Sequence, residues 1–336
     1  MPTMRAIVVT TANAPFELVQ REVPVPAARW VRVKVEACGV CHSDLFVKSG
    51  GFPNLQLPRI PGHEIAGRVD AVGAEVTAWR VGDRVGVGWH GGHCFTCDAC
   101  RRGDFLACAA GKITGISHDG GYAEFACVPA ESLARIPDNL DAADAAPLLC
   151  AGVTTFNAIR NAGVRPGGTL AVLGIGGLGH LAVQYAAKLG FRTLAISRGA
   201  DKAKLAAELG AHVYVDTNVA PAADQLKKLG GADLVLATAP ASDAIEGVVG
   251  GLAPRGKLLI VAAPFTPMSI HAMHLLSGKD IAGWPSGTSI DSEDTMAFSA
   301  LQGVRPKIEK FALADAERAF GHMMENKARF RAVLVP

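Results

Sequence analysis

Two hydrophobic patterns divide the chain near residue 150. Before it, short apolar stretches punctuated by glycines predict strands over residues 5–10, 31–36, 66–73 and 81–85. After it, apolar stretches separated by helical ones predict buried strands over residues 169–173, 193–197, 213–216, 233–237 and 257–262. Strands that alternate with helices indicate βαβ units and a parallel sheet. We therefore predict an α/β protein in which a mostly β part precedes a doubly wound parallel sheet.

The pattern becomes mixed again beyond about Trp284. A helix is predicted near residues 314–326 and a last strand over 332–335. With 336 residues the chain is long enough for two domains of ordinary size.

Composition and charge exclude several classes of protein. A net charge of +2 gives no basic excess of the kind that nucleic-acid binding needs, so we expect no nucleic-acid partner. The uncharged run Leu170 to Ala187 is long enough to span a membrane, but its glycines favour a strand, a turn and a helix. The first residues lack a basic-then-apolar signal segment. We expect a cytoplasmic protein without a membrane partner.

Four of the eight cysteines follow one another within fifteen residues. This spacing predicts a closed, tetrahedral, structural zinc site rather than a disulfide framework. The alternative is a zinc ribbon that binds nucleic acid, but the two arginines of this loop are offset by two aspartates. The predicted ligands are Cys94, Cys97, Cys100 and Cys108.

A second metal site is predicted from residues that lie far apart in the sequence. Cys41 and His63 belong to two short clusters that also carry carboxylates, and Cys150 is the best candidate for a third ligand. Two thiolates and one imidazole leave one tetrahedral position open, as in catalytic zinc sites. The alternative is that Cys41 and Cys150 are buried apolar thiols.

A glycine motif opens the second part of the chain. It fits G-x-G-x-x-G and stands between a predicted strand and a predicted helix, which is the dinucleotide-binding fingerprint. Glycines let the backbone turn and approach a pyrophosphate at the helix N-terminus. The cofactor-binding residues predicted here are Gly174, Gly176, Gly177, Leu178 and Gly179.

The end of the next strand bears on the choice of cofactor. NAD binding favours an acidic residue at this position, and none is present. Ser197, Arg198 and Lys202 could instead hold a 2′-phosphate, so NADP(H) is favoured over NAD(H). The alternative is that Arg198 stacks on the adenine and either cofactor is accepted.

Taken together, these motifs resemble the zinc-dependent medium-chain alcohol dehydrogenases, in the bacterial and cinnamyl-alcohol branches. The resemblance covers nearly the whole chain, and its motifs lie at residues 39–44, 61–64, 94–108, 150–154 and 174–180. It implies a GroES-like catalytic domain (1–151 and 285–336, with the zinc lobe at 91–109) and a Rossmann coenzyme domain (152–284). It also implies an active site in the cleft between the domains and a homodimer or homotetramer.

The resemblance implies roles for individual residues. Cys41, His63 and Cys150 would hold the catalytic zinc, and Glu64 would lie beside it and could enter its coordination shell. Asp44 would accept the free N–H of His63. The remaining roles are a hydrogen bond from Ser43 to the alcohol oxygen, cofactor phosphate contacts from His42 and Arg331, and a place near the nicotinamide for Thr154.

One position departs from the family pattern. Many members carry a histidine two residues after the aspartate of the first motif, as the outer end of a proton relay, whereas this chain has Phe46. We expect the proton to leave through Ser43 and the cofactor ribose to water. Phe46 and Trp89 are expected to line the substrate pocket, where aromatic walls favour primary alcohols and unbranched or aromatic aldehydes; the alternative for both is core packing.

The function expected from these features is an NAD(P)-dependent alcohol dehydrogenase or aldehyde reductase with two zinc ions per subunit. Zinc would act as a Lewis acid on the alcohol, and the nicotinamide would carry the hydride. A polyol or secondary-alcohol dehydrogenase and a non-catalytic cofactor-binding relative are the alternatives. The last is disfavoured because all three catalytic zinc ligands are present.

Overall fold

In the computed structural model, which describes residues 2–264 and 266–336, the chain divides into two compact units. The first comprises Met1–Val153 and Gly287–Pro336, and the second is Thr154–Ser286. The C-terminal segment therefore belongs to the first unit, as the resemblance implies. The divisions follow Val153 and Ser286, close to the boundaries expected after residues 151 and 284.

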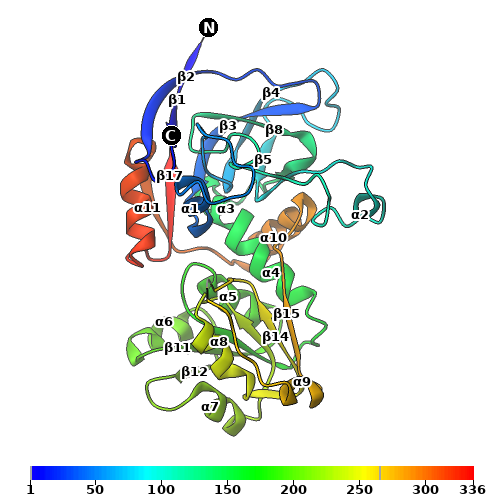
Figure 1. Cartoon of the computed structure of the whole chain (residues 1–336), viewed down its shortest axis with the longest axis vertical. Helices are drawn as coiled ribbons and strands as arrows, with labels where there is room; N and C mark the ends of the chain where they lie inside the picture. Colours follow the sequence, from blue (N-terminus) through cyan, green and yellow to red (C-terminus); the bar gives the residue numbers. More distant parts are fainter. Residues whose placement is uncertain (1, 265) are drawn as a thin grey trace. The chain divides into compact units, whose positions relative to one another are not determined.

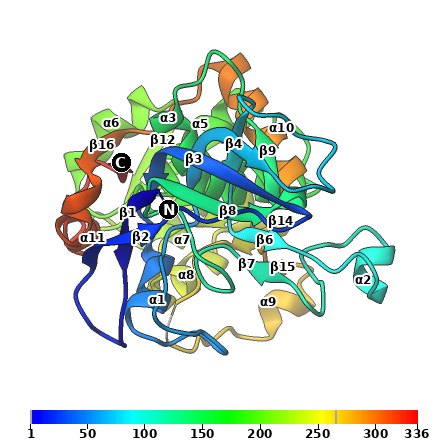
Figure 2. The same ribbon diagram turned by 90° about the horizontal axis from the view of Figure 1, so that it is seen from above.

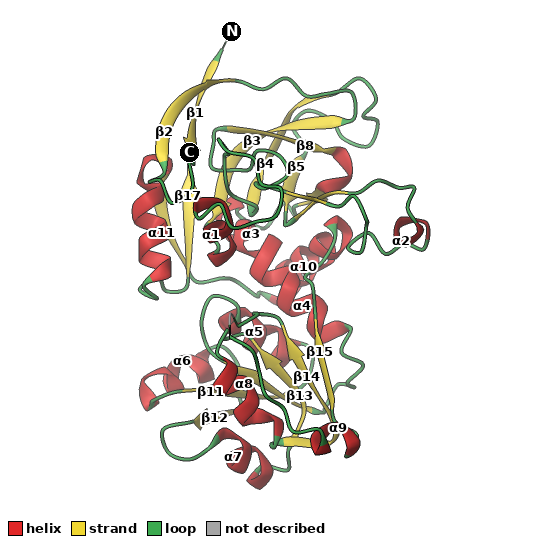
Figure 3. Cartoon of the chain, in the orientation of Figure 1, coloured by secondary structure: helices red, strands yellow, loops and turns green. Residues whose placement is uncertain are grey.

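The first unit is rich in strands (Figure 1, Figure 3). Its strands are β1 (Thr3–Val8), β2 (Glu17–Glu22), β3 (Trp30–Gly39), β4 (Ile65–Val72), β5 (Arg84–Val87), β6 (His90–Gly92), β7 (Lys112–Ile113), β8 (Phe125–Pro129), β9 (Leu133–Arg135), β16 (Ile308–Ala312) and β17 (Arg331–Val335). Its helices are α1 (Leu45–Lys48), α2 (Asp98–Arg101), α3 (Ala142–Pro147), α10 (Ser289–Gln302) and α11 (Ala316–Met324). α4 (Val153–Arg160) begins at the last residue of this unit.

The main sheet of the first unit brings the C-terminal strand to the first metal motif. Its strand order is β16-β17-β3-β4-β5-β9, and β8 also pairs with β3. Alternate residues of β3 are buried in the core, as expected for a sheet with one apolar face. β17 runs antiparallel to β3 with Leu334 opposite Cys38, so the C-terminal strand lies beside the strand that leads to Cys41.

The second unit is a doubly wound sheet. Its strands are β10 (Thr169–Leu173), β11 (Arg192–Ser197), β12 (Val213–Asp216), β13 (Ala232–Ala237), β14 (Leu252–Ile260) and β15 (Asp280–Gly283). They pair in parallel in the order β12-β11-β10-β13-β14-β15, which is the 3-2-1-4-5-6 order of dinucleotide-binding folds. Its helices are α5 (Gly179–Lys188), α6 (Ala203–Glu208), α7 (Ala222–Lys228), α8 (Ser242–Val249) and α9 (Met273–Leu276).

The five strands predicted for this unit are confirmed, and β14 differs most from its predicted bounds. β14 begins at Leu252 instead of residue 257. The register shifts between Ala232 and Leu234 of the neighbouring β13, so the bulged strand continues through Pro254 and Gly256. Those two residues normally mark a turn, and the sequence pattern therefore placed the start of the strand too late.

The two apolar stretches that raise a membrane question have different structures. Leu170 to Ala187 forms β10, a glycine turn and most of α5, as predicted. Among the described residues one helical run, Ala142–Arg160, is long and apolar enough to cross a membrane. In this run 83% of the most apolar window is buried inside the protein, as in the core helix of a globular domain.

Candidate active site and metal centres

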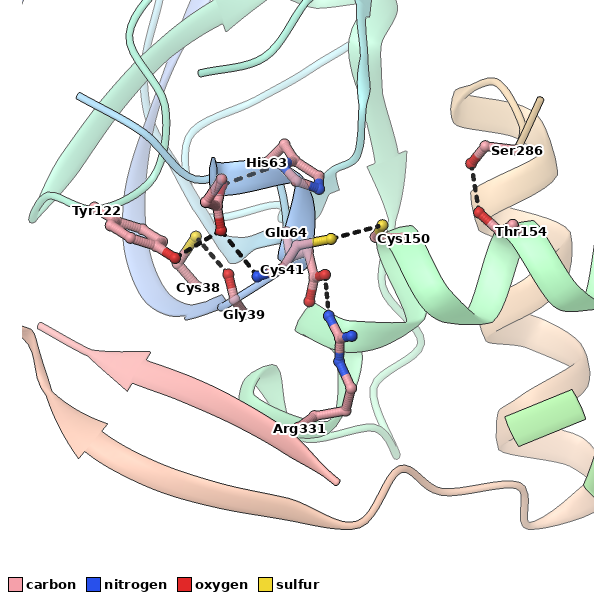
Figure 4. A network of polar contacts seen from close by, with 11 residues as sticks. Cys38, Gly39, Cys41, His63, Glu64, Tyr122, Cys150, Thr154, Ser286 and Arg331 are labelled. Atoms are coloured by element: carbon pink, nitrogen blue, oxygen red, sulfur yellow. Dashed lines mark hydrogen bonds and ion pairs between the residues drawn. The ribbon is translucent and has the colours of Figure 1, made fainter. Parts of the chain in front are cut away.

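Four side chains from three segments of the first unit converge on one point (Figure 4). The ligand atoms of Cys41, His63, Glu64 and Cys150 all lie within 4.8 Å of one another. Cys41 follows β3, and His63 and Glu64 precede β4. Because β3 and β4 pair antiparallel with Cys38 opposite Ile65, both motifs leave the sheet at the same end.

Cys150 reaches this point from an irregular helical turn. Residues Leu148–Gly152 form a π-helical turn between α3 and α4, directly after Pro147. Proline lacks the backbone N–H that an α-helix would use, and π turns occur often at functional sites. The π turn was not predicted, and Pro147 is the sequence feature that marks its start.

The geometry of this cluster fits a tetrahedral zinc. The sulfurs of Cys41 and Cys150 are 3.8 Å apart. Two sulfurs each about 2.3 Å from a tetrahedral zinc lie at about this separation. His63 is only 2% exposed, and among the described residues no group hydrogen-bonds to its buried Nε2. That atom is therefore free to act as a ligand.

Asp44 arranges the groups around His63. Its Oδ1 lies 3.4 Å from Nδ1 of His63, while its Oδ2 accepts hydrogen bonds from the backbone N–H of Cys41 at 2.8 Å and from the hydroxyl of Tyr122 at 2.7 Å. A proton held on Nδ1 leaves the Nε2 lone pair for a metal. The contact between Asp44 and His63 was predicted from the resemblance; the one with Tyr122 was not.

The charges in the cluster suit metal binding. The pKa of the Cys41 thiol is lowered, first by its hydrogen bond with Cys150 and then by His63. Burial alone would lower the pKa of His63, but Cys41 and Asp44 outweigh it and raise the pKa. Without a metal these directions favour a Cys41 thiolate beside a protonated His63, and zinc binding would release the proton of the imidazole.

Glu64 forms a buried ion pair with Arg331 that was not predicted. The Glu64 side chain is fully buried, and its Oε1 contacts Nη2 of Arg331, which is 4% exposed. Burial raises the pKa of Glu64 to about 7, against the effect of Arg331, which lowers it. A Cβ on Gly39 would lie 1.9 Å from Oε2 of Glu64, so this carboxylate needs a glycine at position 39. The expected contact of Arg331 with a cofactor phosphate stays a prediction.

Aromatic side chains border the His63 ring. Trp89 meets it edge to face, with ring centroids 4.9 Å apart. Phe52 lies next to Trp89 at 6.3 Å, and Phe46 next to Phe52 at 5.7 Å. Each of these rings is half-buried. The row Phe46–Phe52–Trp89 extends from the metal cluster and also packs against the core of the first unit, as the core-packing alternative expects. Its role as a substrate wall stays a prediction.

The two residues that follow Cys41 lie at the surface of this site. His42 and Ser43 belong to the short 3-10 turn His42–Asp44; His42 is exposed and Ser43 is half-buried. Neither position conflicts with a contact to cofactor or substrate, and both roles stay predictions.

The second cluster consists of the four cysteines of the lobe. Their sulfurs all lie within 4.8 Å of one another, with Cys94 and Cys100 4.0 Å apart and Cys97 and Cys108 3.9 Å apart. Hydrogen bonds from Thr96 and from the backbone N–H of Cys97 lower the pKa of Cys94 to about 5. The lobe, with α2 at its tip, extends away from the main sheet of its unit (Figure 2). Four converging thiols fit a closed zinc site.

The glycines of the second unit have the geometry that their motif predicts. Gly174 has φ +94°, and a Cβ on Gly179 would lie 1.9 Å from the carbonyl oxygen of Gly174. On Gly176 a Cβ would meet no described atom within 4 Å. The first glycine thus makes the turn, the last lets α5 pack against it, and Gly176 leaves room for a ligand.

The predicted phosphate-binding residues lie near this turn. The N–H of Gly174 donates to Ile196, which precedes Ser197, and Nζ of Lys202 lies 3.5 Å from the carbonyl oxygen of Ile175. Arg198 is exposed. Asp216, a carboxylate outside the predicted set, ends the adjacent β12, where it accepts the N–H of Gly199 at 2.8 Å.

Thr154 is buried and hydrogen-bonded within the second unit. Its hydroxyl donates to that of Ser286 at 2.9 Å. The expected place of Thr154 near a nicotinamide stays a prediction.

Comparisons with known proteins cover nearly the whole chain. Residues 27–138 match the alcohol dehydrogenase GroES-like domain, and residues 177–300 match the zinc-binding dehydrogenase model. The alcohol dehydrogenase patD of Penicillium expansum is 46% identical over 337 residues, covering 99% of this chain and 97% of the relative. Aldehyde reductase AdhA of Synechocystis sp. is 32% identical over 333 residues, covering 98% of each. The structure of a cinnamyl alcohol dehydrogenase from Sorghum bicolor matches with a TM-score of 0.90 and 31% identity over 99% of this chain and 98% of that one.

Proposed function

Since the chain belongs to the zinc-dependent medium-chain alcohol dehydrogenase family and is an oxidoreductase, we propose that it interconverts primary alcohols and aldehydes with a preference for NADP(H). Alcohol dehydrogenase or aldehyde reductase activity of the zinc type is common to its relatives. The observation that carries the proposal is the Cys41–His63–Cys150 cluster, whose sulfur spacing and free Nε2 suit a zinc with one open position.

Two zinc ions per chain are proposed. Cys41, His63 and Cys150 would hold the first, and the four lobe cysteines the second. When bound, the first zinc and a nicotinamide would supply a Lewis acid for the substrate oxygen and an acceptor for hydride.

The side chains around the first cluster would orient its ligands and carry the substrate proton. Asp44 holds the proton on Nδ1 of His63 and thereby fixes the orientation of the ring. Ser43, half-buried in the turn after Cys41, would accept the hydroxyl proton of the alcohol at its Oγ and release its own outward. Phe46 has no atom that can carry a proton, so this route ends without an imidazole. Phe46→His should therefore change the pH dependence of alcohol oxidation if position 46 lies on the route.

The substrate class is proposed from the aromatic row. Phe46, Phe52 and Trp89 form an apolar wall of rings packed edge to face, which begins at His63. Such a wall favours unbranched or aromatic aldehydes over branched secondary alcohols. The sorghum relative, a cinnamyl alcohol dehydrogenase by name, is consistent with a flat aromatic substrate.

The cofactor preference is proposed from Ser197, Arg198 and Lys202. Arg198 is free to point to solvent at the end of β11, and Lys202 reaches the glycine turn. Oδ1 of Asp216 already accepts hydrogen bonds from the backbone N–H groups of Gly199 and Asn218. This oxygen is therefore less available to accept a hydrogen bond from a ribose hydroxyl, as NAD binding would need.

A homodimer or homotetramer is also proposed. β15 is an edge strand of its sheet, and the neighbouring α9 exposes three large apolar side chains, Met273, Leu275 and Leu276. An unpaired edge beside exposed apolar side chains suits pairing with a second copy. Sedimentation analysis of the purified protein tests this directly, and a monomer at micromolar concentration would refute it.

The experiment that tests the function is a set of initial rates with NADPH and with NADH. The aldehyde panel runs from acetaldehyde through hexanal to benzaldehyde and cinnamaldehyde, with one ketone. We expect NADPH and flat aldehydes to be preferred. Arg198→Ala should lower kcat/KM for NADPH about 10- to 100-fold, because it removes a charge-assisted contact with the 2′-phosphate. The value for NADH, which lacks this phosphate, should change little. Lys204→Ala, at an exposed position of α6, is the matched control.

Other outcomes would change the proposal in defined ways. A strong NADH preference would overturn the phosphate assignment and leave the zinc chemistry intact. Preference for the ketone or for polyols would move the substrate class to secondary alcohols. No turnover by protein that holds two zinc ions would contradict the enzymatic proposal for these substrates.

A further inference from the structure

We propose that Tyr122 is a positioning residue for the catalytic zinc, acting through Asp44 on two of the three zinc ligands. The inference rests on the proposed assignment of Cys41, His63 and Cys150 as zinc ligands. It adds a residue from a loop that lies 78 positions from Asp44 in the sequence.

The hydrogen bonds around Asp44 carry the proposal. Tyr122 is fully buried, and its hydroxyl donates to Oδ2 of Asp44 at 2.7 Å. The same oxygen accepts the backbone N–H of Cys41 at 2.8 Å, and the other oxygen faces Nδ1 of His63 at 3.4 Å. One carboxylate therefore holds the main chain of one zinc ligand and the ring of another.

The tyrosine hydroxyl limits the rotation of this carboxylate. A carboxylate held on one side by two donors presents its second oxygen in a fixed direction, here toward Nδ1 of His63. The ring is then held with Nε2 facing the sulfurs of Cys41 and Cys150. Without the tyrosine hydroxyl, Oδ2 of Asp44 keeps only the hydrogen bond from the Cys41 N–H. Because Asp44 is only 1% exposed, water cannot easily replace the lost donor, and the carboxylate would turn toward another one.

The position of the Tyr122 ring is itself fixed by the main chain before His63. Gly62 has φ +99°, and a Cβ there would lie 2.4 Å from Cδ1 of Tyr122. The N–H of Tyr122 donates to the carbonyl oxygen of Pro61 at 3.0 Å, and its carbonyl oxygen accepts the N–H of Ile7 at 2.8 Å. Figure 4 shows the ring on one side of the cluster, with its hydroxyl directed inward. The ring is thus locked against the segment that carries His63.

An alternative role for Tyr122 is to fill the core, where its ring also meets that of Phe16 edge to face at 6.0 Å. The two roles separate cleanly by substitution. Tyr122→Phe keeps the ring and removes the hydroxyl, and Tyr122→Leu removes the ring as well. If packing alone mattered, only the leucine variant would disturb the metal.

The test is the rate at which zinc leaves each site, measured with a chromogenic chelator on protein loaded with two zinc ions. In Tyr122→Phe we expect the zinc of the Cys41–His63–Cys150 site to leave about 10-fold faster than in the wild type. This is the low end of the effect on metal affinity when a group that hydrogen-bonds to a metal ligand is removed. The zinc of the lobe should leave at its wild-type rate and so serves as the internal control. Tyr185→Phe, a buried tyrosine of the second unit, is the matched control variant.

Cobalt supplies a second readout that packing would not change. With Co²⁺ in the catalytic site, the absorption bands report the ligand geometry, and we expect them to shift in Tyr122→Phe but not in Tyr185→Phe. Unchanged zinc release and unchanged cobalt bands in Tyr122→Phe would overturn the inference, including when Tyr122→Leu loses metal. A different result would contradict the proposed function, namely a wild-type protein that holds a single zinc ion, in the lobe.

Discussion

The hydroxyl of Thr154 donates a hydrogen bond to the hydroxyl of Ser286 at 2.9 Å, and these two residues are the first and last of the nucleotide-binding unit. Ser286 has φ 89°, which is unusual for a residue with a side chain. Its carbonyl oxygen accepts hydrogen bonds from Asn157 and Trp284, each at 2.9 Å. Hydrogen bonds from Thr154 and Asn157 to Ser286 therefore connect the two ends of this unit.

Ser286→Ala should destabilise the protein and Ser286→Gly should do so less. Alanine removes the acceptor of the Thr154 hydroxyl, at about 1 kcal/mol, and retains the unfavourable φ. Glycine loses the same hydrogen bond but adopts this φ easily, so we expect it to be more stable than alanine by about 1 kcal/mol. Urea unfolding of the two variants measures the difference. An alanine variant at least as stable as the glycine variant would show that φ at this position carries no strain.

His90 is expected to make stability depend on pH. Its ring stacks on that of His93, with Nε2 of His90 3.2 Å from Nδ1 of His93. Burial, and then His93, lower the pKa of His90 to about 4, against Asp291, which raises it. Since the folded pKa lies below the ordinary value of about 6.5, the unfolded chain binds this proton more tightly. Stability is then fully present above about pH 6.5 and falls as the pH drops toward 4.

The expected contribution is about 2 kcal/mol lost between pH 7 and pH 5. Unfolding by urea at pH 7, 6 and 5, with zinc in excess, measures it as the difference between wild type and His90→Gln. His271→Gln, at an exposed position, is the control and should keep the wild-type slope. The assignment is wrong if the slope persists in His90→Gln.

Removal of one lobe ligand should lower the stability of the protein and its zinc content. Cys97→Ser leaves three thiols, which cannot close a tetrahedral structural site. We expect the zinc content to fall by one per chain and the melting temperature to fall by about 5–10 °C, as when a small ordered lobe unfolds locally. Cys127→Ser, a half-buried thiol outside both clusters, should retain two zinc ions. Full zinc content in Cys97→Ser would refute the four-thiolate site.

Much of the fold could be predicted because its signals are local. The strands of the parallel sheet are short apolar runs bounded by glycines and helical stretches, and each predicted strand is present in the structure. The lobe cysteines are similarly close in sequence. The distant cluster was predicted from residue types and from the resemblance, and the pairing of β3 with β4 brings Cys41 and His63 to the same end of the sheet.

What could not be predicted depends on contacts between residues far apart in the chain. Tyr122 and Asp44 are separated by 78 positions, and Arg331 and Glu64 by 267. Neither Tyr122 nor Arg331 belongs to a motif that names its partner, and an aromatic residue before a strand normally predicts core packing. Gly39 and Gly62 were the available signals, since each leaves space that Glu64 and Tyr122 fill.

The central claim is that Cys41, His63 and Cys150 form a catalytic zinc site, and zinc content measured together with alcohol oxidation in Cys150→Ser tests it most directly. The wild type should hold two zinc ions per chain, and Cys127→Ser should match it in both zinc content and rate. Cys150→Ser should hold one zinc ion and lose at least about 1,000-fold in kcat/KM, which corresponds to the several kcal/mol that a bound metal contributes to the transition state. A Cys150→Ser protein that keeps two zinc ions and its activity would contradict the account.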